Sequence, residues 1–123
     1  MKLWRKGFLF CLGGGLYASL ELLYRGRTHG SMFLLGGACF LLLGRLRHLR
    51  LSWPVLTLLG AAAITAGELA TGLIVNRDYS VWDYRALPAN FLGQICLQFA
   101  LLWMPISLLG MGMYGVLEEK LPQ

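Results

Sequence analysis

One uninterrupted apolar run, residues 53–75, limits the chain more than any other feature of its sequence. The run is 23 residues long and contains a single ionisable side chain, Glu68. As a helix it would extend about 34 Å, at a rise of about 1.5 Å per residue, and the hydrocarbon core of a bilayer is about 30 Å thick. The run therefore predicts a transmembrane helix, with Pro54 in its first turn.

Three further apolar segments accompany this run. Residues 7–24 end in charged residues without a small-residue cleavage site, which favours a retained span over a signal peptide. Residues 30–44 are short for a transmembrane helix, so they either cross the membrane or form a re-entrant segment. Residues 90–117 are longer than the bilayer is thick, and we expect a kink at Pro105. The predicted fold is an all-α membrane protein, a bundle of four transmembrane helices with a short second helix, forming one domain over residues 1–123.

The composition supports a membrane protein and excludes several soluble classes. Hydrophobic residues make up 57% of the chain and charged residues 14%, against roughly 45–50% and 25% in soluble domains. These figures exclude an ordinary soluble enzyme and a nucleic-acid module. The sequence has no P-loop, no Ser–His–Asp set and no HExxH motif, so we expect no enzyme, no cofactor, no metal and no ATP bound by the chain itself. The three cysteines, Cys11, Cys39 and Cys96, are interpreted as buried hydrophobic residues.

Positive charges are divided unequally between the two sides of the predicted bundle. One side carries seven Lys and Arg residues and the other carries four. By the positive-inside rule both termini are expected in the cytoplasm, in a multi-pass protein of the cell membrane. The basic loop with Arg45, Arg47, His48 and Arg50 is interpreted as a contact for lipid headgroups or a topology signal, with docking of an acidic protein as the alternative.

Glu68 is the most informative polar residue, because a charge within a bilayer is costly. Thr65 and Gly72 share its helix face at i−3 and i+4 spacing. One interpretation is a ligand for an ion, a proton or a substrate in a cavity. The other is a packing group that bonds to a neighbouring helix and is protonated by desolvation.

Polar residues at the outer ends of the spans extend the first interpretation. Glu21 and Arg25 form a favourable i, i+4 pair, which is either a local ion pair or part of the same pocket as Glu68. The loop after the third span is either an aromatic belt with surface ion pairs or a cap in which Asp83 pairs with Arg25 or Arg27. The other residues of this candidate site are Asn76, Trp82, Tyr84, Asn90 and Gln94.

Asn90, Gln94 and Gln98 follow one another at four-residue spacing at the start of the fourth apolar segment. On a helix these amides would form one polar stripe about two turns deep. In lipid such a stripe either bonds to another helix or lines a polar pocket. Either way, the stripe and Glu68 would belong to the outer half of the bundle.

Many of these residues recur in a recognisable pattern. The third span, the loop after it and the fourth span carry Gly67-Glu68, Gly72, Asn76, Trp82-Asp83-Tyr84, Pro88, Asn90, Gly93, Ile95-Cys96-Leu97 and Trp103. The first loop and second span add Tyr24-Arg25-Gly26-Arg27-Thr28-His29, Met32 and Gly36-Gly37. Over residues 15–104 the chain resembles the putative ABC-transporter type IV membrane proteins, the CmpB-like family of predicted permeases. The resemblance implies transport, and Arg85 and Gln94 depart from its pattern.

Two functions of different classes follow. The first is a small transport component with an outer-half polar pocket around Glu68. The second is a non-transporting accessory, lipid-binding or sensory module whose polar residues serve helix packing, and a membrane enzyme acting on lipid is a third hypothesis. The expected partners are the bilayer and either further copies or other membrane subunits, because small residues at four-residue spacing predict close helix contacts. The pairs are Ala62/Ala66, Ala66/Ala70 and Ala63/Gly67.

Overall fold

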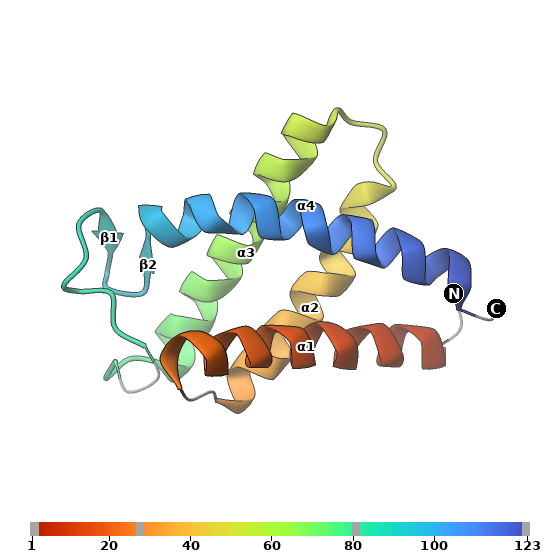
Figure 1. Cartoon of the computed structure of the whole chain (residues 1–123). Coiled ribbons are helices and arrows are strands. Elements are labelled where there is room, and N and C mark those ends of the chain that lie inside the picture. Colours follow the sequence, from red (N-terminus) through yellow and green to blue (C-terminus); the bar gives the residue numbers. More distant parts are fainter. Residues whose placement is uncertain (1–2, 27–28, 80–81, 122–123) are drawn as a thin grey trace.

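Four long helices make up most of the structure, a computed structural model that describes residues 3–26, 29–79 and 82–121. They are α1 (Leu3–Arg25), α2 (Gly30–Arg47), α3 (Trp53–Val75) and α4 (Leu97–Lys120), shown in Figure 1. Each helix is long and apolar enough to cross a membrane, judged by length and composition. The prediction of four apolar helices is confirmed.

Local sequence explains where these helices begin and end. α3 has Pro54 in its first turn, where the missing N–H group costs no hydrogen bond. α2 follows His29, whose ring nitrogen accepts a hydrogen bond of 3.2 Å from the Ser31 backbone N–H. α2 extends past the apolar run 30–44 to Arg47, whose guanidinium group donates a hydrogen bond to Glu118 of α4.

The stretch that was expected to begin the fourth span folds differently. Residues 90–96 contain an antiparallel hairpin of two short strands, β1 (Asn90–Phe91) and β2 (Ile95–Cys96). α4 begins only at Leu97. The prediction of a helix from residue 90 onward is therefore wrong, and the fold is not purely helical.

Backbone conformation and side-chain bonding both explain this difference. Leu92 and Gly93 have φ angles of 57° and 69°, in the left-handed region that a right-handed helix cannot contain. The Asn90 side chain accepts a hydrogen bond of 3.0 Å from the Gly93 backbone N–H, a local bond that competes with helix formation. Asn90, Gln94 and Gln98 consequently do not form one helical stripe.

The helices alternate in direction along the chain. α1 and α4 lie across the molecule in opposite directions, and α2 and α3 cross them obliquely (Figure 1). We use the term hairpin end for the side of the molecule that contains the β-hairpin and the last turn of α1. The opposite end, which holds both chain termini and the connection from α2 to α3, is the terminus end.

Glycines allow close packing in the most extensive helix contact, which lies between α1 and α2. A Cβ atom on Gly36 of α2 would overlap the Cβ atom of Tyr17 on α1, and one on Gly13 would overlap that of Phe40. Small residues thus do mediate close approach, as in many membrane bundles. The expected contact residues of α3 differ among themselves. Gly67, paired with Ala63, is half-buried and lies against Leu35 of α2, whereas the other three lie on the exposed face of α3: Ala62, Ala66 and Ala70.

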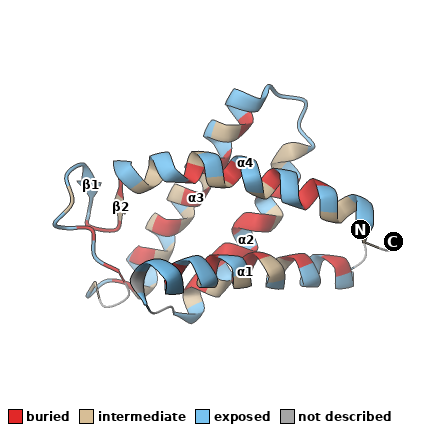
Figure 2. Cartoon of the chain, in the orientation of Figure 1, coloured by how far each residue is buried: buried red, intermediate tan, exposed pale blue. Residues whose placement is uncertain are grey.

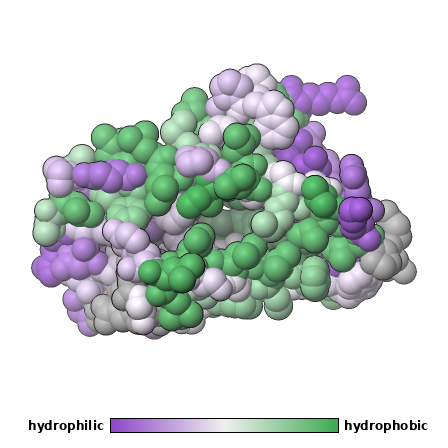
Figure 3. All heavy atoms as spheres, viewed as in Figure 1, coloured by the Kyte–Doolittle hydropathy of each residue, from purple (hydrophilic) through white to green (hydrophobic). Residues whose placement is uncertain are grey.

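Burial separates the inward faces of the helices from a broadly apolar exterior. Figure 2 shows the buried residues on the inward faces, and Figure 3 shows hydrophobic side chains over much of the visible surface, with hydrophilic ones gathered near the two ends. Cys39 and Cys96 are buried as expected, whereas Cys11 is exposed. The exposed apolar exterior fits helices whose outer faces contact lipid.

Candidate functional site

A buried glutamate lies where three other parts of the chain meet. Glu68 on α3 is only 3% exposed. Its carboxylate accepts a hydrogen bond of 2.7 Å from the ring N–H of Trp103 on α4. The hydroxyl groups of Tyr17 on α1 and Tyr84 in the loop after α3 donate to the same carboxylate at 3.5 Å each. Three aromatic donors therefore converge on one acidic side chain.

The inward face of α3 explains why Glu68 is buried. Several buried residues of α3 recur at four-residue spacing: Gly60, Ile64, Glu68 and Gly72. At Gly72 an added Cβ would overlap the Gln94 side chain, so the lack of a side chain lets the hairpin approach α3 closely. Thr65, expected on the same face, is half-buried, and within the described part of the chain its hydroxyl has no hydrogen-bond partner.

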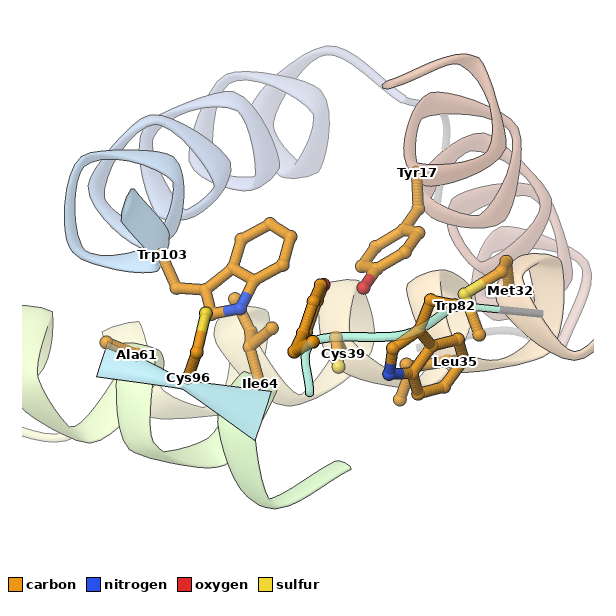
Figure 4. Close-up of a cluster of buried hydrophobic side chains, with 10 residues drawn as sticks. Tyr17, Met32, Leu35, Cys39, Ala61, Ile64, Trp82, Cys96 and Trp103 are labelled. Carbon is orange, nitrogen blue, oxygen red and sulfur yellow. The ribbon is translucent and has the colours of Figure 1, made fainter. Parts of the chain in front are cut away.

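The aromatic donors are held by stacking as well as by hydrogen bonds. The rings of Tyr17 and Trp103 stack with centroids 5.6 Å apart, and those of Tyr84 and Phe99 stack at 5.0 Å. Figure 4 shows the Tyr17 hydroxyl and the Trp103 ring nitrogen pointing into the space between α1 and α4. Because the rings fix each other, the three polar atoms keep a defined direction toward Glu68.

A cavity of about 290 Å³ adjoins this cluster. Its lining is largely aromatic and apolar, and Glu21 is its acidic member. The lining residues are Tyr17, Leu20, Glu21, Leu23, Tyr24, Tyr84, Phe99, Leu102, Trp103 and Ile106. Glu68 is not among them, so the rings that bond to it stand between its carboxylate and the cavity.

A longer apolar groove continues from the same region. It has a volume of about 410 Å³, runs between α1, α2 and α4, and shares Tyr17 and Trp103 with the cavity. Figure 3 shows a hollow between the side chains of α1 and α4. The cavity and the groove therefore adjoin each other beside α1, and both are mainly apolar, with Glu21 as the charged residue in the cavity lining.

Glu21 joins the site from α1. It is 9% exposed and lies one helical turn after Tyr17, so both side chains face the cavity. Arg25 closes α1, but its side chain lies outside the described part of the structure, as does all of Arg27. The expected pairs of Glu21 or Asp83 with these arginines therefore lie outside the described residues.

Three of the predicted site residues form a buried hydrogen-bond network beside the cavity. The Asn76 side-chain amide donates to the Trp82 carbonyl at 2.6 Å and to Gln94 Oε1 at 2.9 Å. The Gln94 amide donates to the Asn76 carbonyl at 3.0 Å, and the Trp82 ring N–H donates to the Gln94 carbonyl at 2.8 Å. These bonds fasten the loop after α3 to the end of that helix and place Tyr84 over Glu68.

Asp83 and Asn90 lie on the surface of the same loop, away from the cavity. The Arg85 guanidinium donates to both carboxylate oxygens of Asp83, at 2.9 and 2.8 Å. These side-chain hydrogen bonds, helped by the Arg85 backbone N–H, lower the pKa of Asp83 from 3.8 to about 2. Arg85 also lies 4.0 Å from the Tyr79 ring centroid. Neither Asp83 nor Asn90 lines the cavity.

The described residues offer little metal-ion or catalytic chemistry. Within residues 3–26, 29–79 and 82–121, His, Cys, Asp and Glu side chains form no group of three able to hold a metal ion. The polar atoms of the site are one glutamate with aromatic donors and a second glutamate on the cavity wall. Such an arrangement can bind and orient a small molecule.

Comparison with known proteins places the chain in a family. A model of the family described as putative ABC-transporter type IV matches residues 15–121. The chain belongs to this family. No curated protein and no solved structure matches it. With its four apolar helices, this member of the ABC-transporter type IV family is a multi-pass membrane protein.

The family match covers the whole of the aromatic site. Tyr17, Glu68, Tyr84 and Trp103 all lie within residues 15–121. Sequence reasoning missed Tyr17 and gave Trp103 no role beyond the family pattern. The one signal for Tyr17 was its place one turn before Glu21, because residues four apart share a helix face.

Proposed function

We propose that this protein is a small membrane-spanning component of a transporter, and that a solute occupies the cavity at its hairpin end. The observation that supports it best is the convergence of Tyr17, Tyr84 and Trp103 on buried Glu68, directly beside a cavity. A buried carboxylate is costly in a bilayer, and such residues commonly mark solute or ion pathways.

In this proposal the residues have different roles. Glu21 and Tyr84 contact the solute, because both line the cavity. Glu68 orients the three aromatic side chains that bond to it. When these side chains rotate away, the Glu68 carboxylate binds the solute directly. Arg25, four residues after Glu21 in the sequence, is assigned the role of counter-charge. The network of Asn76, Trp82 and Gln94 positions Tyr84, whereas Asp83 and Asn90 shape the outer loop.

The orientation of the protein follows from its charges. Both termini lie in the cytoplasm of a cell-membrane protein, because seven of its eleven Lys and Arg residues belong to the terminus end. The hairpin end and its cavity then face outward. Four helices enclose little volume, so further copies or other membrane subunits complete the pathway, and nucleotide is bound by a partner, since the sequence has no P-loop.

A non-transporting accessory module is the second candidate, and one observation favours it. Asn76 and Gln94, both named as site residues from sequence, are 0% and 2% exposed and bond to each other and to the loop. Their polarity thus serves packing. If Glu68 did the same, the protein would be a structural, lipid-binding or sensory subunit.

Thermal unfolding in detergent distinguishes the two candidates. Purified wild type is compared with Glu21→Gln and Glu68→Gln across a panel of cations and small solutes, with exposed Glu119→Gln as the matched control. A solute at 100 times its dissociation constant adds about 2.7 kcal/mol of stability. The proposal expects a solute that stabilises wild type and Glu119→Gln but neither site variant. A panel without effect, with Glu68→Gln merely less stable, favours the accessory module.

A further inference from the structure

The excess positive charge of the molecule lies at the terminus end. Among the described residues, this end has six Lys and Arg side chains against two acids, and the hairpin end has two against four. The six are Arg5, Lys6, Arg45, Arg47, Arg50 and Lys120, and the two acids are Glu118 and Glu119. None of these residues lies at the hairpin end, where the solute is proposed to bind. The excess positive charge of the terminus end therefore needs a separate explanation.

Three helices meet here at one residue, Glu118. The Arg5 guanidinium on α1 donates to the Glu118 backbone carbonyl at 2.7 Å. Arg47 at the end of α2 donates to the Glu118 carboxylate at 3.2 Å, and the ring of His48 contacts its other oxygen at 3.0 Å. Glu118 thereby holds the guanidinium groups of two helices close to α4.

One carboxylate does not match the positive charge around it. Arg5 and Arg47 both bond to Glu118, so two guanidinium groups share one acidic residue, and the exposed Arg45 adds a third positive charge in the last turn of α2. Arg5 is 3% exposed, and its Nε–H, like that of Arg47, has no hydrogen-bond partner in the described part of the chain. The junction therefore has surplus positive charge.

The surroundings of this junction match the headgroup layer of a membrane. Trp4 and Trp53 are 48% and 55% exposed at this end, and Leu49 and Leu51 are 48% and 44% exposed beside them. Exposed tryptophans are typical of the interface between headgroups and hydrocarbon. An acyl chain would find apolar surface next to the arginines, which an acidic soluble protein would not need.

We propose that the junction of α1, α2 and α4 at the terminus end binds the phosphodiester headgroup of an anionic membrane lipid. Guanidinium groups donate paired N–H bonds to phosphate oxygens, and basic pockets between helix ends suit such headgroups. Arg45 and the exposed edge of Arg47 contact the phosphate, and Arg5 positions Arg47 through their shared partner Glu118. The bound lipid then reinforces the link between α1 and α4.

Lipid binding to delipidated protein in a neutral detergent tests this proposal. Phosphatidylglycerol, phosphatidylcholine and inorganic phosphate are added separately, and bound lipid is counted by native mass spectrometry beside thermal unfolding. We expect phosphatidylglycerol to bind and to raise the melting temperature, and the other two to have little effect. Equal effects of the two lipids would overturn the proposal, and so would stabilisation by inorganic phosphate alone, which would show a simple anion site.

Charge variants then locate the site. Exposed Arg45→Gln, which leaves the packed residues intact, should weaken phosphatidylglycerol binding about fivefold, and Arg47→Gln at least as much. Glu118→Gln should strengthen it, because the competing carboxylate loses its charge, although the lipid-free protein becomes less stable. Arg77→Gln at the hairpin end is the matched control and should leave binding unchanged. An effect of Arg77→Gln as large as that of Arg45→Gln, or weaker binding in Glu118→Gln, would contradict the proposal.

Discussion

Glu68 and Glu118 each hold several helices together, but with different kinds of partner. Glu68 on α3 bonds to α1 and α4, and Glu118 on α4 bonds to α1 and α2. Glu68 is buried and accepts hydrogen bonds from neutral aromatic groups, Tyr17 and Trp103 among them. The Glu118 side chain is 26% exposed and bonds to a guanidinium group and an imidazole. The same residue type thus serves as an acceptor for dipoles at one end and as a counter-ion at the other.

The difference reflects how each environment treats charge. In the apolar interior a carboxylate needs hydrogen bonds from nearby groups, because no water replaces its lost hydration. At the membrane surface, water and salt screen an ion pair, so each contact contributes little by itself. The hairpin end should therefore be sensitive to the loss of one partner, and the terminus end to ionic strength.

Glu68→Ala should have the largest effect on stability. The change leaves the buried donors of Tyr17 and Trp103 without their acceptor and should lower the free energy of unfolding by about 2–3 kcal/mol. Denaturation in detergent, followed by tryptophan fluorescence, measures this loss, with exposed Glu119→Ala as control. A loss no larger than that of Glu118→Ala would remove the contrast between the two ends.

Asn76→Ala and Asn90→Ala form a matched pair within the hairpin end. Asn76 is fully buried and bonds to Trp82 and Gln94, whereas Asn90 is exposed and bonds to turn carbonyls. We expect a loss of about 2 kcal/mol for Asn76→Ala and less than about 1 for Asn90→Ala, because water replaces exposed bonds. Equal losses in chemical denaturation would show that the network does not fasten the loop.

Glu118→Ala should cost about 1 kcal/mol at low salt, since its partners are partly exposed. The cost should shrink in 1 M salt, where the screening length falls to about 3 Å. The cost of Glu68→Ala should change much less, because the Glu68 carboxylate is buried and salt screens buried interactions far less than exposed ones. Melting temperatures of both variants at low and high salt measure this difference, and equal salt dependence would contradict it.

Asp83→Asn should have the smallest effect, and the effect should depend on pH. The pKa of Asp83 is lowered from 3.8 to about 2 by hydrogen bonds from Arg85, so the charged form stabilises the fold. This contribution is complete above about pH 4 and is lost as the pH falls through about 2. Wild type and Asp83→Asn should therefore differ in melting temperature at neutral pH and converge in acid. A difference that persists at about pH 2 would show that another group is responsible.

Hydropathy predicted much of the fold and part of the site. The helix over residues 53–75 has the predicted bounds, and Glu68 was identified as a key residue because a lone charge in an apolar run is conspicuous. Its partners could not be predicted, because Tyr17 and Trp103 lie 51 and 35 positions away along the chain. The four-residue spacing of Asn90 and Gln94 predicted that both lie on one helix face. That prediction was wrong, because such spacing indicates a shared face only where a helix forms.

The apolar runs alone determined that the chain has four long helices, because burying that many apolar side chains requires backbone hydrogen bonds made within each segment. They also determined that Glu68 is the charge inside the third run. The three-dimensional structure decided which groups surround that charge. Aromatic donors from α1, the loop and α4 meet at Glu68 only because glycines at Gly36 and Gly72 let the backbones approach and the left-handed turn at Gly93 folds the hairpin back onto α3.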